Sequence, residues 1–275
     1  MESRRGRRHG SFAERALAIA KSTFPPLGAV VIVLVLWQAV VLLNVWPPYL
    51  FPPPLEVLGA LGDQARSPDF YKAIGITLGR AVTGYSLALL IGTAVGVAMA
   101  VVPVLRRALG SLITALQTMP SVAWFPFAIL LFRLSEGAIL AVVVLGAAPS
   151  IANGIISGID NVPPQLTAAA RVLGARGPFL YRRVILPAAM PNVLAGLKQA
   201  WAFAWRSLLA GELLVIVAGR PSLGAKMQFA RDFSDAPTMI ALLVVLLVIG
   251  ILVDRGFGLA DLRVRTRRGL VQPAR

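Results

Sequence analysis

Apolar residues fall into six blocks along the chain, separated by shorter polar or proline-rich segments. The blocks cover residues 27–45, 73–101, 109–132, 137–159, 191–217 and 237–253. An α-helix needs about 17–25 residues to cross the hydrocarbon core of a bilayer, and each block has about that length or more. The pattern therefore predicts an all-α polytopic membrane protein with six transmembrane helices.

Prolines, small residues and a few polar residues interrupt these blocks. Pro120, Pro126 and Pro149 predict kinks in the third and fourth blocks that can open backbone groups toward a cavity. The second block opens with the polar residues Thr77, Arg80 and Thr83. Glycines recur at four-residue spacing in three pairs: Gly75 and Gly79, Gly92 and Gly96, Gly154 and Gly158. Such pairs allow close helix contacts, and we expect packing within the bundle in preference to a seam between two copies.

The composition and the placement of charge agree with a membrane protein. The chain is 57% hydrophobic and 14% charged, whereas soluble domains average about 45–50% and about 25%. Of its 27 Lys and Arg residues, 18 lie in the leader, the tail and the two loops that would share their side of the membrane. The positive-inside rule therefore predicts that both termini are cytoplasmic. Because the net charge of +15 follows topology and does not gather on one face, nucleic-acid binding is not predicted.

The predicted organisation has three parts. Residues 1–26 form a basic cytoplasmic leader, 27–255 a six-helix transmembrane domain, and 256–275 a basic cytoplasmic tail. The first apolar run lacks a small-residue cleavage pattern, so we interpret it as a span and not as a cleaved signal. The outer loop 46–72 begins with runs of proline, which predict a stiff extended segment followed by a short amphipathic helix.

The residue types exclude most catalytic chemistry. The chain has no cysteine and one histidine, His9 in the leader, so a thiol nucleophile, a disulfide and a Cys/His metal site are not expected. A glycine-rich phosphate loop would end in Gly-Lys, and the sequence has no such dipeptide. We therefore expect no enzyme activity, no metal and no cofactor in this chain.

The predicted cytoplasmic loop 160–187 is unusual because arginine, glycine and proline gather in it. Residues 163–164 are prolines suited to the first turn of a helix, which Asp160 or Asn161 can cap. Gly174 can adopt the left-handed turn that ends this helix, and the Gly-Pro that follows starts a second one. The segment predicts a compact helix–turn–helix that docks on a partner protein.

The same loop carries a resemblance to ABC-transporter importer permeases of the type I fold. Their frame is E-A-A, three residues, G, nine residues, I-x-L-P, and Ala168 here replaces the acidic position. The residues that match the rest of the frame are Ala169, Ala170, Gly174, Val184, Leu186 and Pro187. In that family the loop is the coupling helix, which seats in a cleft of the ATP-hydrolysing subunit. The resemblance implies this coupling role for Ala168, Ala169, Ala170, Arg171, Gly174, Leu186 and Pro187.

The resemblance extends over about residues 47–255 and is closest to permeases for aliphatic sulfonates, taurine, nitrate or bicarbonate. It rests on "PPPLEVLGAL", "MPSVAWFPFAILLF" and "AWRSLLAGELL", while Arg133 stands where relatives often have glycine. It implies a second permease copy, two cytoplasmic subunits that bind ATP and Mg, and an extracytoplasmic solute-binding protein. It also implies a bacterial plasma membrane location, and leaves open whether the two permease copies are identical.

Three charged residues within the fifth block are candidates for the solute pathway: Lys198, Arg206 and Glu212. Charges inside spans cost about 2.5–3.5 kcal/mol on insertion scales and often mark functional sites. Arg206 and Glu212 are six residues apart and cannot pair on one helical face. A path lined by lysine and arginine would favour a small anion such as an aliphatic sulfonate. The alternative is that Lys198 snorkels to the interface while the other two brace helices.

Two other functional classes compete with an importer permease. A secondary transporter or channel that works without an ATPase usually shows inverted repeats, and residues 27–132 and 137–253 show no convincing repeat. A membrane-embedded enzyme lacks catalytic residues here. The sequence leaves the solute open among sulfonates, nitrate, bicarbonate and small ring compounds.

Overall fold

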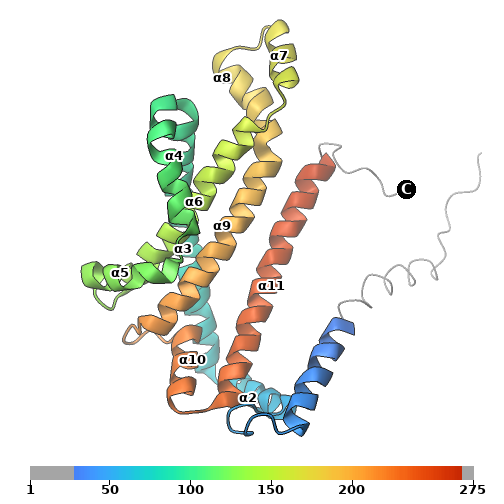
Figure 1. The fold of residues 1–275 in the computed structure, drawn as a ribbon, viewed down its shortest axis with the longest axis vertical. Coiled ribbons are helices and arrows are strands. Elements are labelled where there is room, and N and C mark those ends of the chain that lie inside the picture. The colour runs from blue at the N-terminus through green and yellow to red at the C-terminus, as the bar shows by residue number, and fades with distance from the viewer. Residues whose placement is uncertain (1–27, 268–275) are drawn as a thin grey trace, which may run out of the picture.

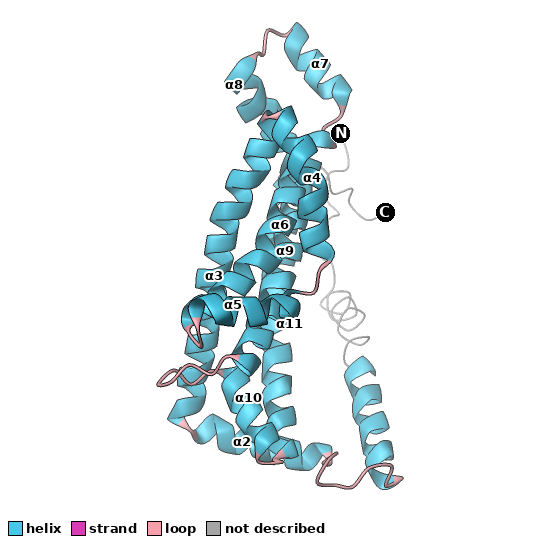
Figure 2. Ribbon diagram, turned by 60° about the vertical axis from the view of Figure 1, so that its left-hand side comes forward, coloured by secondary structure: helices cyan, strands magenta, loops and turns pink. Residues whose placement is uncertain are grey.

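The computed structural model describes residues 28–267, and every regular element in this range is a helix (Figure 2). The all-α prediction is therefore confirmed for these residues. The predicted leader, including His9, and the end of the predicted tail lie outside the described residues.

The helices follow one another with short connections. After the helix Gly28–Leu42 they are α2 (Pro54–Arg66), α3 (Pro68–Val101), α4 (Pro103–Thr118), the 3₁₀ turn η1 (Ser121–Trp124), α5 (Phe125–Phe132), α6 (Glu136–Asp160), α7 (Pro164–Val172), α8 (Gly177–Leu180), the π-helical turn η2 (Tyr181–Ile185), α9 (Leu186–Leu214), α10 (Leu223–Asp232) and α11 (Ala236–Arg267). α11 continues past residue 255, so the predicted boundary between membrane domain and tail falls inside a helix.

Three helices are long and apolar enough to cross a membrane, namely α3, α6 and α11. A fourth apolar stretch consists of α4 followed by η1 and α5, and it bends by 102°. Pro120 stands at this bend, as the interrupted third block predicted, whereas Pro126 lies in the first turn of α5. The two other predicted blocks correspond to the shorter helix Gly28–Leu42 and to α9, which carries charged residues.

α6 is the central helix and packs between α3 and α9 (Figure 1). Glycines allow both contacts, because a Cβ on Gly92 would lie 2.6 Å from the carbonyl oxygen of Ala148. At the other contact, Gly154 of α6 faces Gly196 of α9. The prediction that small residues pack within the bundle is confirmed for the pairs at 92/96 and 154/158. The pair at 75/79 has no neighbouring atom within 4 Å of a built Cβ.

The segment 160–187 forms the predicted helix–turn–helix, which projects at the top of Figure 1. Gly174 and Gly177 have φ values of +84° and +53°, so both take the left-handed conformation that glycine tolerates best. The expected side-chain cap is absent from α7, because Pro163 occupies the N-cap position. Asp160 instead forms an ion pair with Arg106 at the start of α4.

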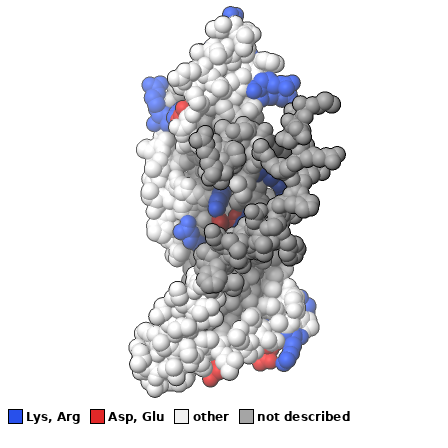
Figure 3. Space-filling model, turned by 90° about the vertical axis from the view of Figure 1, so that its right-hand side faces the viewer, with Lys and Arg blue, Asp and Glu red and all other residues white. Residues whose placement is uncertain are grey.

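The opposite end of the bundle holds α2 and α10 (Figure 1). α2 is the short amphipathic helix predicted after the proline-rich segment. Trp37 donates from Nε1 to the carbonyl oxygen of Pro52, which ties the helix Gly28–Leu42 to that segment. Charged side chains lie mainly toward the two ends of the molecule, as Figure 3 shows for the flank beside α11.

Candidate functional site

The seven residues predicted to contact an ATPase all lie in or beside the α7–α8 hairpin. They occupy α7, the turn after it and the start of α9: Ala168, Ala169, Ala170 and Arg171, then Gly174, then Leu186 and Pro187. Every one of these side chains or glycine positions is at least partly exposed. The structure therefore brings the seven residues to one accessible end of the molecule.

The tip of α7 carries two bare apolar side chains. Val172 and Leu173 are 88% and 87% exposed, the highest values among large hydrophobic residues in the range 28–267. The base of the hairpin is anchored, because Val162, Ala175 and Leu180 are buried together against the ends of α6 and α9. The hairpin is thus a fixed support for an exposed apolar surface.

Glu212 of α9 is fully buried and bonded at both carboxylate oxygens. Its Oε1 accepts from Arg80 Nη1 at 2.9 Å. Its Oε2 accepts from Thr77 Oγ1 at 2.9 Å and from the backbone N–H of Gly224 at 3.0 Å. Thr77 Oγ1 in turn accepts from the backbone N–H of Leu223 at 3.0 Å. The carboxylate therefore joins α3, α9 and the start of α10.

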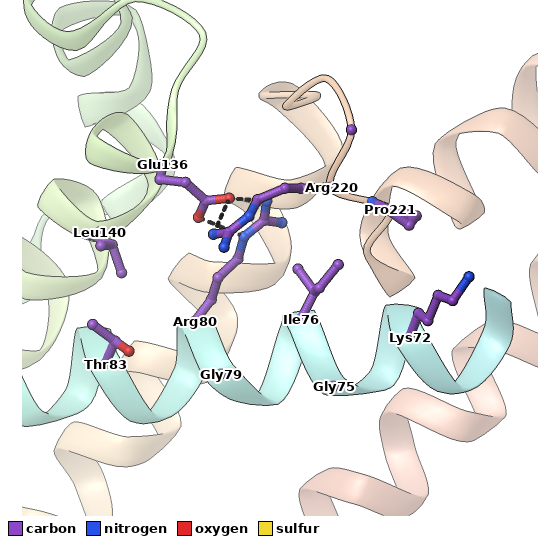
Figure 4. Close-up of a pocket in the computed structure, with 11 residues that line it drawn as sticks. Lys72, Gly75, Ile76, Gly79, Arg80, Thr83, Glu136, Leu140, Arg220 and Pro221 are labelled. Atoms are coloured by element: carbon purple, nitrogen blue, oxygen red, sulfur yellow. Dashed lines mark hydrogen bonds and ion pairs between the residues drawn. The ribbon is translucent and has the colours of Figure 1, made fainter. Parts of the chain in front are cut away.

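Arg80 of α3 connects this carboxylate to a second one. Its Nε and Nη2 donate to the two oxygens of Glu136 at 2.8 and 2.6 Å, a bidentate pair at the start of α6. Arg220 also approaches Glu136, with Nη1 3.3 Å from Oε1 (Figure 4). Arg80 is 4% exposed, so its charge is compensated by two carboxylates as a buried charge requires.

A cavity of about 600 Å³ opens beside this ion network. Its lining residues come from α3, from the start of α6 and from the loop before α10: Lys72, Gly75, Ile76, Gly79, Arg80, Thr83, Glu136, Leu140, Gly219, Arg220 and Pro221. The two glycines leave space on the α3 wall (Figure 4).

Lys198 and Arg206, the other two pathway candidates, line a different groove of about 540 Å³ between α9 and α11. Lys198 Nζ lies 2.8 Å from Asp254 Oδ1. Arg206 donates from Nε to the carbonyl oxygen of Ala202 and places its guanidinium 4.8 Å from the ring centre of Phe203. The structure therefore brings two of the three candidates together and separates Glu212 from them.

Sequence reasoning identified Arg80 as an intramembrane charge but assigned it no partner. Its partners lie 56 and 132 residues away, a distance that no local spacing can reveal. The tryptophans of the α9 groove, Trp201 and Trp205, were also missed, and their spacing of four residues on a charged helix was the available signal. Among the described residues no cluster of acidic and histidine side chains could hold a metal ion.

Comparison with known proteins identifies the family. Residues 88–266 match the family model of the binding-protein-dependent transport system inner membrane component. The chain belongs to this family. The matched range includes α4 to α10, and with them the α7–α8 hairpin and the groove on α9. This chain is therefore an ABC-transporter permease component, located in the membrane and crossing it several times.

The curated relatives of the permease agree with the subfamily expected from the sequence. The taurine transport system permease protein TauC of Escherichia coli strain K12 is 28% identical over 251 residues, which are 90% of each chain. A putative aliphatic sulfonates transport permease protein, SsuC of Bacillus subtilis strain 168, is 27% identical over 81% of this chain and 80% of its own.

The fold is also that of a solved transporter. A chain of the MetNI methionine ABC transporter in an inward-facing conformation superposes with a TM-score of 0.60 at 21% identity. The superposition covers 71% of this permease and 96% of that chain. At this identity the match shows a common fold.

Proposed function

We propose that this permease is the transmembrane subunit of an ATP-driven importer for a small anion. The observation that carries the proposal is the α7–α8 hairpin, an anchored support with its most apolar residues exposed at one end of the bundle. The six spans are then the helix Gly28–Leu42, α3, the bent α4–α5 pair, α6, α9 and α11. Both termini and the hairpin face the cytoplasm, in accord with the placement of lysine and arginine.

The hairpin has the geometry of a mechanical connector. It continues through η2 directly into α9, with no loop between them. Buried contacts at Ile185 and Ala189 join η2 and the start of α9 to the base of the hairpin. A displacement of α7 by a partner therefore moves α9 with it, since closely packed elements transmit displacement.

The proposed partners follow from this arrangement. Two permease copies form the path, and each hairpin seats in one of two cytoplasmic ATPase subunits, which bind ATP and Mg. A solute-binding protein delivers the solute from outside. Closure of the two ATPases draws the hairpins together and switches the path between inward- and outward-facing states. The printed names of two relatives, for taurine and aliphatic sulfonates, support an anionic solute with a sulfonate group.

Purification through a tag on this chain tests the coupling role. We expect ATPase activity to co-purify with the unaltered chain from membranes of the source organism. In the double variant Val172→Glu/Leu173→Glu, two carboxylates replace the exposed apolar surface, and the co-purified activity should fall more than about tenfold. The folded chain should persist, because both side chains are already exposed in it.

The matched control is Phe233→Glu, which places a carboxylate at an 81% exposed position at the far end of α10. It should retain the ATPase activity. A chain that purifies without ATPase activity, and whose transport is indifferent to the double variant, would return the secondary transporter or channel as the better function.

A further inference from the structure

The exposed face of α9 differs from that of a lipid-facing helix. Between the two ends of α9, the exposed positions carry only small or polar side chains: Asn192, Ala195, Lys198, Gln199, Ala202 and Arg206. Their spacing of three and four residues places them along one face of the helix. This stripe, here called the α9 polar face, covers most of the length of the helix.

Neighbouring helices expose the opposite kind of surface. α3 exposes large apolar side chains such as Val82 and Leu90, and α11 exposes Leu247 and Leu252. The large apolar residues that α9 exposes, Leu186 and Leu214, stand at its two ends. Lipid chains solvate aliphatic surface and penalise an exposed guanidinium, so α3 and α11 suit contact with lipid. The α9 polar face suits water or a polar solute.

The groove on this face joins positive charge to aromatic surface. The rings of Trp201 and Trp205 stack with centroids 6.2 Å apart and an interplanar angle of 18°. The edge of Tyr85 packs against Trp201 at 5.3 Å and fixes its position. Lys198 and Arg206 stand at the two ends of this aromatic surface, about 12 Å apart along the helix axis.

The two cations are not equivalent. Lys198 is paired with Asp254. Arg206 has no carboxylate within ion-pair distance among residues 28–267, and only its Nε is bonded there. Its Nη1 and Nη2 can therefore donate to an added anion, and a guanidinium binds two oxygens of one anionic group with good geometry. The groove thus has one uncompensated positive charge at the Arg206 end.

We propose that the α9 polar face is a wall of the solute path and that its groove is a subsite for a small organic anion with an apolar body. Arg206 holds the anionic head, a sulfonate or carboxylate, while Trp201 and Trp205 contact the body. This inference rests on the proposed importer function and adds the chemical class that the path selects.

Cysteine accessibility tests the proposal directly, because the chain has no cysteine of its own. Ala202→Cys places one thiol on the α9 polar face beside Arg206, and Leu247→Cys places the control thiol on the exposed apolar face of α11. Membrane vesicles that hold the full chain and its co-expressed partners are treated with two water-soluble methanethiosulfonate reagents. One reagent ends in a sulfonate and the other in a trimethylammonium group.

We expect the thiol at position 202 to react with both reagents and the control thiol to be silent. The sulfonate reagent should react at least about fivefold faster than the cationic one, because the field of Arg206 attracts the anion. Adding Arg206→Gln should remove this preference, whereas Arg231→Gln on α10 should retain it. A small alkyl or aryl sulfonate should slow the labelling.

Three results would overturn the subsite. The thiol at 202 may not be one that either reagent reaches; it could instead cross-link to a second copy, which would make the face a packing seam. Labelling that only an added anionic phospholipid slows would make the groove a lipid site. ATPase co-purification is scored on the same vesicles, so loss of the subsite with ATPase retained leaves the importer function standing. Labelling as expected without any ATPase would contradict the importer function instead.

Discussion

Arg80 Nη1 lies 2.9 Å from Glu212 Oε1, although 132 residues separate the two in the chain. Both side chains are buried, at 4% and 0% exposure. Arg80 also binds Glu136, so one guanidinium connects α3 to the start of α6 and to the end of α9. The helices whose contacts form the core are thereby tied together beside the 600 Å³ cavity.

Removal of Arg80 should destabilise the protein strongly. Arg80→Gln leaves the Glu212 carboxylate buried without a compensating charge, which costs about 3–5 kcal/mol. The thermal unfolding midpoint of the detergent-purified chain measures the loss. Arg66→Gln is the control, since the Arg66–Asp63 pair is exposed and contributes about 1 kcal/mol or less. Equal midpoints for the two variants would show that the network does not stabilise the fold.

Thr77 should matter through its hydroxyl. Thr77→Val keeps the shape of the side chain but removes the donor to Glu212 and the acceptor for the N–H of Leu223. A buried amide without a partner costs about 1–3 kcal/mol, and the unfolding midpoint should fall accordingly. Thr77→Ser retains the hydroxyl and should stay closer to the unaltered chain. A larger fall in Thr77→Ser than in Thr77→Val would contradict the assigned hydrogen bonds.

The contact between Gly154 and Gly196 should not tolerate a methyl group. A Cβ on Gly154 would lie 2.7 Å from the Cα of Gly196, and both atoms belong to helix backbones that cannot yield locally. Gly154→Ala should therefore separate α6 from α9 at a cost of about 1–3 kcal/mol.

Gly75→Ala is the matched control for this contact, because a Cβ there meets no atom within 4 Å. Alanine also favours the helix over glycine by about 1 kcal/mol, so this variant should be neutral or slightly stabilising. Thermal midpoints of both variants are compared in the same detergent. A stable Gly154→Ala variant would mean that the helices are farther apart than described.

The turn after α7 should depend on backbone conformation and not on space. Gly174 has φ +84°, and a Cβ there would meet no atom within 4 Å. Gly174→Ala should cost about 1–2 kcal/mol from the left-handed conformation alone, while Gly174→Asn should cost less. Both the midpoint and the co-purified ATPase activity report the effect. If alanine and asparagine weaken coupling equally, the turn conformation is not the reason.

Local patterns predicted much of this molecule. The apolar blocks located the long helices because a helix in lipid must present an apolar surface over its whole length. Prolines at 163 and 164 and glycine at 174 predicted the hairpin, because each acts through its own backbone conformation. The expected cap on α7 was wrong, since Asp160 finds Arg106 of another helix.

The sequence by itself determined the helices, the hairpin and the family frame, because these depend on residues close together in the chain. The tertiary structure decided which charges meet: Glu212 pairs with Arg80, Lys198 with Asp254, and Arg206 is left on the exposed face of α9. A helical period defines a face but not the neighbour that covers it. That neighbour is set by the packing of α3, α6, α9 and α11, so the candidate anion groove became visible only in three dimensions.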